Sequence, residues 1–302
     1  MVIRARQDDL KEIYELHKSI YSELDSSYID YFYRHQYNQI NMYLLKKENK
    51  LVSMGCRIPH TLMVNDQLVK GSIISNLMTA IDYRKQGLMD EILKNMIDNV
   101  EHTELITYVH ASKFFEKYGF ETMFYRREYE FNKTNFKHKT DSRVSKVISF
   151  SDLSDIYAKF ARRFTGYNVR DEKYYKSFNK EVEAQNGQIV TVYNKDSEIV
   201  GYAVIYEKDN VIIIDEAIYL TLDVLFKVIS LGLELRSKVL LRTTTSERLD
   251  LVFTGVHYKD YPYMMARINN YKLFNHLFDS NVDTVEEALA ICKKPLFINE
   301  KV

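Results

Sequence analysis

The sequence has few of the residues that define several common protein classes: 302 residues include no tryptophan, two cysteines, three prolines and nine glycines. Cys56 and Cys292 are too few for a disulfide framework, which favours a cytoplasmic protein. No apolar run approaches the length of a membrane span and no signal-peptide segment opens the chain, so we expect no membrane partner. The 42 basic and 42 acidic residues balance, which disfavours a nucleic-acid partner.

Several sequence motifs are absent as well. The eight histidines contain no His-x-x-x-His pair and the two cysteines are isolated, so we predict no metal site. There is no P-loop and no dinucleotide fingerprint. The chain that remains is 46% hydrophobic and 28% charged, which is ordinary for a globular protein, and its length can hold two domains.

The apolar spacing predicts alternating helices and strands over the first 131 residues. A strand begins at Val2, and a helix with one apolar face begins near Asp8, a candidate N-cap. The further predicted elements are strands at Met42–Lys47 and Leu51–Val64, a strand ending at Thr79, a helix from Leu88 to Val100, a strand at Leu105–Val109, a short helix from Ala111, and a strand at Thr122–Phe131.

The second half repeats this order without repeating the sequence. Asn132–Lys146 is polar and aperiodic, which predicts a boundary between domains. An amphipathic segment begins at Ser151. It is followed by predicted strands at Gln188–Tyr193, Glu198–Glu207 and Asn210–Ile218, a helix at Leu220–Leu235 and a strand at Lys238–Thr243. The fold class we predict is α+β (α/β), with two domains that each have a mixed, mostly antiparallel sheet flanked by helices.

The most informative stretch is Leu77–Met89, which reads as the end of a strand, a turn and the start of a helix. Such a turn leaves backbone N–H groups without partners at a helix end that carries partial positive charge, so a phosphate is its natural ligand. Gly87 allows close approach of the backbone, and Arg84 and Lys85 add positive charge.

These features together resemble the GNAT family of acyl-CoA-dependent N-acetyltransferases. The family's pyrophosphate loop has the pattern Arg/Gln-x-x-Gly-x-Gly/Ala, which Arg84 and Gly87 match, and a later helix carries a motif similar to Phe114–Glu121. Met89 takes the last small position, which looks more like the Eis-type (enhanced intracellular survival) branch. Ile156–Glu172 and Tyr263–Ile268 also resemble segments of that branch.

This resemblance implies tandem GNAT domains. We expect a first domain at residues 1–135 with the acetyl-CoA loop, a second, degenerate domain at 145–268, and a short helical remnant of a third domain at 269–302 with helices near Tyr271–Phe278 and Val285–Lys293. The second domain has no Arg-x-x-Gly turn between Ile218 and Asp223, so we expect it to serve as a scaffold. Eis-type proteins resemble hexamer formers, so a homo-oligomer is possible.

The resemblance also implies a co-substrate, acetyl-CoA, and an acceptor, a primary amine of the aminoglycoside, polyamine or lysine type. Leu77, Met78 and Thr79 would receive the pantetheine and the thioester. The residues that would surround the pyrophosphate are Arg84, Lys85, Gln86, Gly87, Leu88, Met89 and Asp90.

The catalytic groups are less defined. Phe115 and Phe120 occupy the two positions at which the family and its Eis-type branch place a proton-donating tyrosine, and a phenyl ring cannot donate a proton. Tyr118 and Tyr108 are the alternative donors, and water is another.

The Eis-type branch uses the C-terminal carboxylate as base, which would here be that of Val302. Asp25, Glu23 and His110 are further candidate bases. Asp25 together with Tyr28 and Phe32 would line an amine pocket.

Two other functions are compatible with these residues. A non-catalytic acyl-CoA-binding or interaction protein would explain the missing tyrosines. The Fem-type peptidyltransferases, which use aminoacyl-tRNA, also contain tandem GNAT domains, but the neutral isoelectric point of about 7.1 and the CoA-type loop disfavour that reading.

Overall fold

A computed structural model describes residues 1–21, 26–138 and 140–300. The chain divides into two compact units. Unit 1 contains Met1–Met123, Tyr263–Lys293 and Glu300–Val302, and unit 2 contains Phe124–Pro262 and Lys294–Asn299. The expected domains at 1–135, 145–268 and 269–302 follow the sequence continuously, whereas each unit is assembled from separated segments.

Unit 1 is built on a mixed sheet with the strand order β1-β2-β3-β4-β5-β13. Its strands are β1 (Val2–Arg4), β2 (Met42–Lys47), β3 (Lys50–Val64), β4 (Gln67–Thr79), β5 (Ile106–His110) and part of β13 (Tyr258–Ile268). Its α-helices are α1 (Leu10–Ile20), α2 (Ser26–Tyr31), α3 (Leu88–Asp98), α7 (Tyr271–Phe278) and α8 (Val285–Ala290). β4 and β5, which α3 connects, run parallel.

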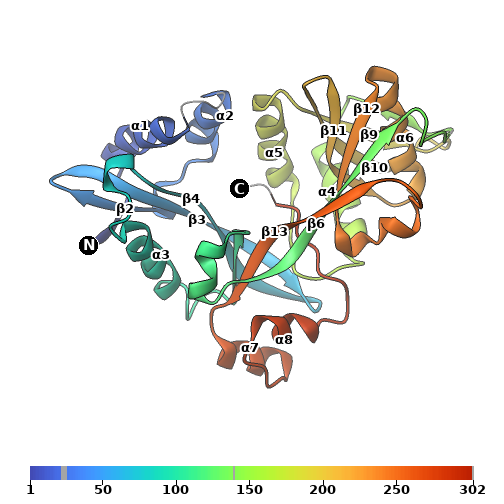
Figure 1. The fold of residues 1–302 in the computed structure, drawn as a ribbon. Helices are drawn as coiled ribbons and strands as arrows, with labels where there is room; N and C mark the ends of the chain where they lie inside the picture. The colour runs from blue at the N-terminus through green and yellow to red at the C-terminus, as the bar shows by residue number, and fades with distance from the viewer. Residues whose placement is uncertain (22–25, 139, 301–302) are drawn as a thin grey trace. The chain divides into compact units, whose positions relative to one another are not determined.

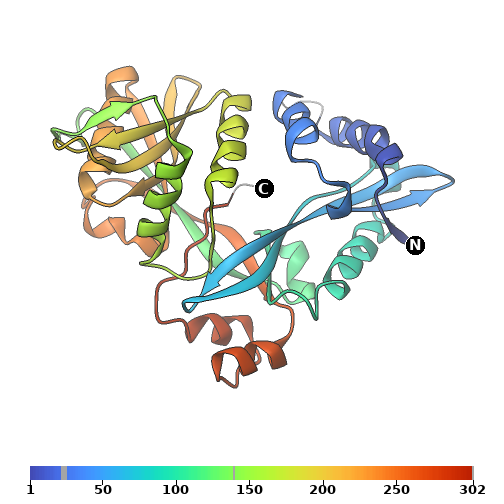
Figure 2. The ribbon, with the colours of Figure 1, turned by 180° about the vertical axis from the view of Figure 1, so that it is seen from behind.

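Helices cover both faces of this sheet, as Figures 1 and 2 show from opposite sides. Neighbouring residues of β2 point to opposite faces. Tyr43 belongs to the core beneath α3, together with Ile92 and Met96. Leu44 belongs to the core beneath α1, together with Ile13. The strands therefore bury apolar residues on both sides, and the sheet is a rigid base for the loops at its edge.

Unit 2 repeats the arrangement with the strand order β6-β12-β11-β10-β9-β7. Its strands are β6 (Glu121–Asn132), β7 (Arg143–Ser145), β9 (Gln188–Tyr193), β10 (Ile199–Lys208), β11 (Val211–Tyr219) and β12 (Lys238–Thr244). Its α-helices are α4 (Phe150–Ala161), α5 (Glu172–Ala184) and α6 (Leu222–Leu235), and α6 connects the parallel strands β11 and β12. The predicted mixed α/β class with mostly antiparallel sheets flanked by helices is confirmed.

In both units a strand from a distant part of the sequence borders the parallel pair. β13 pairs with β5 in unit 1, where Met264 lies opposite His110. β6 pairs with β12 in unit 2, where Phe131 lies opposite Val239. We identified Tyr263–Ile268 by its resemblance to the Eis-type branch but did not predict this strand.

The polar stretch Asn132–Lys146, predicted as a domain boundary, contains ordered elements of unit 2. It contains β7, which pairs with β9, and it buries the ring of Phe136 against Phe131. The chain passes from one unit to the other within β6 instead, between Met123 and Phe124. No helix in the described parts of the chain is both long and apolar enough to cross a membrane.

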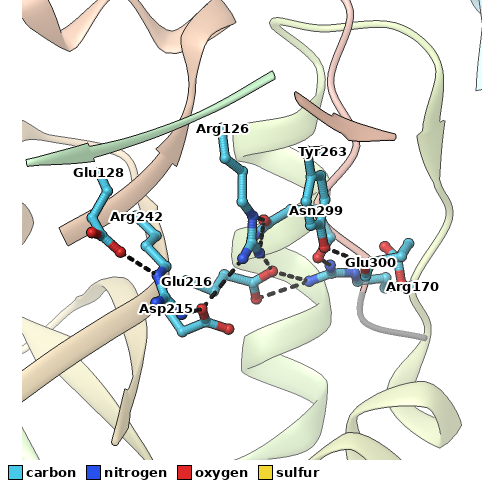
Figure 3. Close-up of polar contacts among 9 residues, drawn as sticks. All are labelled: Arg126, Glu128, Arg170, Asp215, Glu216, Arg242, Tyr263, Asn299 and Glu300. Carbon is cyan, nitrogen blue, oxygen red and sulfur yellow. Dashed lines mark hydrogen bonds and ion pairs between the residues drawn. The ribbon is translucent and has the colours of Figure 1, made fainter. Parts of the chain in front are cut away.

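Unit 2 buries an extended network of charges (Figure 3). The Arg170 guanidinium, whose side chain is fully buried, donates to both carboxylate oxygens of Glu216 at 2.9 Å. The Asn299 amide donates to Glu216 at 2.9 Å and its oxygen accepts from Arg126 Nε at 3.0 Å. Asp215 accepts from Arg126 at 3.3 Å and from Arg242 at 3.0 Å. Each buried charge thus has a partner of opposite sign.

The segment Lys294–Asn299 enters unit 2 beside this network. The Phe297 amide donates to the Thr165 carbonyl at 2.8 Å, and the Thr165 amide donates to the Pro295 carbonyl at 2.9 Å. The buried Phe297 ring packs between Phe160 and Phe164, with ring centroids 5.4 and 5.0 Å apart. The last described residues of unit 2 are therefore part of its core.

We predict that Arg170→Met destabilises the protein by about 3–5 kcal/mol, because Glu216 would stay buried without its cation. The matched control is Lys176→Met, which breaks the exposed pair of Lys176 with Glu172 (3.0 Å) and should cost less than about 1 kcal/mol. Urea unfolding of both variants measures the difference. Equal losses would show that the buried pair contributes no more than a surface one.

Candidate functional site

In unit 1, β4 extends beyond the residues that pair with its parallel neighbour β5. β5 pairs with β4 only at Gly71–Ile74, although β4 continues to Thr79. The register with β3 shifts between Met54 and Cys56, where Asn76 has a left-handed backbone (φ 50°). This bulge turns the end of β4. β5 itself ends at His110, so among the described residues no strand pairs with this side of β4 beyond Ile74.

The loop that follows β4 holds two left-handed residues. Lys85 has φ 60° and Gly87, the N-cap of α3, has φ 76°. Gly87 has no side chain to cap the helix, so the first N–H groups of α3 have no cap from that residue. A Cβ added at Gly87 would meet nothing within 4 Å, which shows that the backbone faces open space there. Arg84 Nε donates to the Thr79 carbonyl at 3.3 Å and ties the loop to the strand.

A cavity of about 450 Å³ lies over the end of β4 and the start of α3. Nine of the residues predicted to bind the cofactor line it: Leu77, Met78, Thr79, Arg84, Lys85, Gly87, Leu88, Met89 and Asp90. Gln86 does not, and its side chain accepts from Lys47 Nζ at 2.6 Å instead. The structure therefore brings together at one cavity residues that the sequence grouped only by motif.

Four other lining residues were missed by sequence reasoning. They are Ile20, Tyr21, Tyr83 and Phe114. Tyr83 directly precedes the Arg-x-x-Gly stretch and Phe114 lies inside the second family motif, so the sequence around both motifs carried a usable signal. Ile20 and Tyr21 come from the end of α1, and only the fold places them there.

Of the two candidate proton donors, Tyr118 ends the 3-10 helix Lys113–Tyr118 and contacts the first turn of α3. Its hydroxyl donates to the Asp90 carboxylate, and the Lys117 ammonium contacts the same oxygen. Burial and the hydrogen bond to Asp90 raise the pKa of Tyr118, so its hydroxyl keeps its proton at neutral pH.

Tyr108 lies on β5 and is completely buried, and it does not line the cavity. Burial raises its pKa above the ordinary tyrosine value. Phe120 is buried in the core beneath α3, and Phe115 packs against that core. The rings at the two tyrosine positions of the family are therefore packing groups here.

The candidate base His110 ends β5 and is exposed. Its ring lies 5.4 Å, centroid to centroid, from that of Tyr263, whose hydroxyl donates to the Glu300 carbonyl (Figure 3). Asp25, Glu23 and Val302 lie outside the described residues. Their proposed roles stay predictions.

Of the predicted amine-pocket residues, the structure describes Tyr28 and Phe32, which lie on the consecutive helical segments Ser26–Tyr31 and Phe32–Gln36. Phe32 is buried in the core beneath α1, and Tyr28 lies partly exposed on α2. A second cavity of about 510 Å³ lies beside these elements, but neither residue lines it. Its lining residues are Gln7, Asp8, Leu10, Lys11, Tyr14, Asp30, Tyr33 and Arg34. Within the described residues, no three His, Cys, Asp or Glu side chains gather to hold a metal ion.

Comparisons with known proteins agree with this geometry. Residues 1–123 match a family model described as an acetyltransferase (GNAT) domain. No curated protein sequence matches the chain.

Solved structures with this fold include a probable N-acyltransferase of unknown function from Enterococcus faecalis V583, with a TM-score of 0.76 and 17% identity over 89% of this chain and 72% of that one. A GCN5-related N-acetyltransferase from Anabaena variabilis has a TM-score of 0.72 and 15% identity over 90% and 73% of the two chains. Eis1 from Mycobacterium abscessus has a TM-score of 0.70 and 12% identity over 91% and 75%. At these identities the likeness shows the fold.

Near the second cavity, His17 is buried and shares a hydrogen bond with Tyr33, Nδ1 to hydroxyl, of 2.9 Å. Burial lowers the pKa of His17 to about 4. The unfolded chain takes up this proton near the ordinary value of 6.5, whereas the folded protein does not until about pH 4. Below pH 6.5 the unfolded state therefore binds more protons, and stability falls as the pH drops toward 4.

We predict that His17→Gln flattens the pH dependence of unfolding between pH 6.5 and 4. His102→Gln, which removes an exposed histidine of unit 1, should leave the slope as it is. Urea midpoints measured across this range give both slopes. A parental slope that survives in His17→Gln would assign the effect to another group.

Proposed function

We propose that this protein is an acetyl-CoA-dependent N-acetyltransferase that acylates a primary amine. The observation that carries the proposal is the cavity in unit 1, which joins the turned end of β4 to the glycine-capped start of α3. A diphosphate fits the helix start, where N–H groups and partial positive charge meet. The free edge of β4 offers backbone groups for an extended amide-containing arm.

The chemistry needs little from side chains. The amine nitrogen attacks the thioester carbonyl, a C–N bond forms and the C–S bond breaks. One proton leaves the nitrogen and one reaches the departing thiolate. The protein supplies proximity and orientation, and backbone donors near the β4 bulge would polarise the carbonyl. Tyr118 is the proton donor we favour, because it lies beside the cavity-lining Asp90 and Tyr108 is enclosed in the core.

We further propose that unit 2 is a degenerate second GNAT domain that binds no acyl-CoA. Its sheet has the same bulge, between Val204 and Ile205, next to a parallel pair that ends at Ile214. The residues that follow Ile214 are Asp215 and Glu216, and their carboxylates are committed to the buried network of arginines and Asn299. The connection to α6 is short and has no glycine or cation.

We also propose that the protein belongs to the Eis-type branch, that its acceptor is a small primary amine and that it forms a homo-oligomer. The likeness to Eis1 supports the fold of that branch, and an aminoglycoside, polyamine or lysine-like amine is the acceptor that the resemblance suggests. A cytoplasmic location is favoured because few cysteines are present and acetyl-CoA is an intracellular thioester.

One observation favours a second candidate function, an acyl-CoA-binding protein without turnover. Phe115 and Phe120 replace the family's tyrosines, and both rings pack in or against the core. Such a protein would bind acetyl-CoA as an acetyltransferase does but release no CoA with any amine.

We predict that the parental protein binds one acetyl-CoA per chain and that Gly87→Glu abolishes binding. The substitution forces a side chain into a left-handed position and adds a negative charge where the diphosphate would lie. Gly255→Glu is a matched control, because Gly255 has φ 77° and nothing within 4 Å of its Cβ position but lies in unit 2. Isothermal titration calorimetry measures all three proteins.

An amine panel then separates the two functions, with CoA release as the readout. Release above background by the parental protein supports the enzyme, and binding without release supports the non-catalytic protein. Absence of binding by the parental protein would contradict both.

For the enzyme, we predict that Tyr118→Phe lowers kcat at least about tenfold, because the thiolate would then depend on water for its proton. The dissociation constant for acetyl-CoA should change much less. Tyr108→Phe should lower kcat less than Tyr118→Phe does, because Tyr108 does not line the cavity. Equal kcat values for Tyr118→Phe and the parental protein would remove Tyr118 from the mechanism.

A further inference from the structure

Three charged and polar groups meet where α3 begins, and the proposed chemistry uses only one of them. Asp90 lies in the first turn of α3, and Lys117 and Tyr118 close the 3-10 helix Lys113–Tyr118. The Lys117 ammonium and the Tyr118 hydroxyl both donate to Asp90 Oδ1. All three residues belong to unit 1.

Asp90 keeps its negative charge in this setting. The hydrogen bonds from Lys117 and then from Tyr118 lower the pKa of its carboxyl. The Asp90 side chain is 33% exposed and that of Lys117 is 56% exposed, so water and salt screen the pair only in part.

The position of Asp90 is unusual for a loop that would hold a diphosphate. Its side chain lines the cavity together with Arg84, Lys85 and Gly87. In the absence of a ligand, a carboxylate in the first turn stabilises the helix through its dipole. When a diphosphate arrives at the same helix end, the carboxylate opposes it, because like charges a few ångströms apart repel. The Lys117 ammonium on the same oxygen partly cancels that repulsion.

We propose that Asp90 and Lys117 form an opposed pair of charges that sets the affinity of the cavity for acyl-CoA. Asp90 weakens the binding of the diphosphate and Lys117 strengthens it. This inference rests on the proposed function, since it concerns the ligand of the same cavity. Both residues act on affinity by charge, and neither touches the reacting atoms.

The opposed charges of Asp90 and Lys117 would affect how readily the enzyme releases its product. Acetyl-CoA and its product CoA carry the same diphosphate, so a loop that holds the donor too tightly also retains the product. Product release limits turnover in many enzymes. A carboxylate held at the diphosphate site keeps the affinity for both ligands moderate.

The test is the sign of the change in affinity when each charge is removed. Calorimetry with acetyl-CoA and with CoA, at about 0.02 M and about 1 M salt, compares the parental protein with three variants. We expect Asp90→Asn to tighten binding by about threefold or more and Lys117→Met to weaken it by a similar factor at low salt. The double variant should return to within about twofold of the parental value, and all differences should shrink at high salt.

Asp98→Asn is the matched control. It removes the same charge from an exposed position eight residues further along α3, about 12 Å away, and should leave the affinity unchanged.

A merely structural role for these contacts predicts a different pattern. If the contacts only joined α3 to the 3-10 helix Lys113–Tyr118, Asp90→Asn and Lys117→Met would both weaken binding. The double variant would then not recover the parental affinity. That result would overturn the inference while leaving acetyl-CoA binding by the parental protein intact. A parental protein that binds no acetyl-CoA would overturn the proposed function itself.

Discussion

The divergence of β4 from β5 is the constraint on which the rest of unit 1 depends. β5 ends at His110, one residue after its last pair with β4, whereas β4 continues to Thr79. Here the pairing stops at Ile74, and the bulge at Asn76 turns the last residues of β4 away. Beyond this interruption of the pairing, no strand of the described residues pairs with the β5 side of β4, and polar backbone left unpaired is costly to bury unless a ligand or water pairs with it. The cavity, the loop and the start of α3 are all arranged around this interruption.

Unit 2 meets the same constraint in another way. Its parallel pair also stops next to a bulge, at Ile214, but the following residues are acidic and bind arginines. The segment Lys294–Asn299 completes that core from within the chain. The two sheets are of similar construction but differ in what lies where the parallel pairing stops. In unit 2 it is paired side chains and a segment of the chain, and in unit 1 it is an open cavity.

Local patterns in the sequence predict local structure well. β2 and α7 occupy the predicted ranges, because alternating or helical spacing of apolar residues is a local property. Nine of the residues grouped by motif line one cavity, and these residues come from one short stretch of the chain. That Ile20, Phe114 and Lys117 meet the start of α3 depends on contacts over long sequence distances, which the motifs themselves do not encode. The same limit explains why β13 and the buried partners of Asn299 escaped prediction.

The order of strands along the chain also bears on how the protein is made. The sheet of unit 1 is complete only when β13 pairs with β5, and β13 ends at Ile268. A ribosome that has released residues 1–123 has therefore delivered the whole cavity but not the strand that borders its sheet. During synthesis, one edge of β5 stays unpaired while more than a hundred residues of unit 2 emerge from the ribosome. An unpaired edge strand can pair with other chains. A fragment cut at the limit of the matched domain would keep that exposed edge permanently.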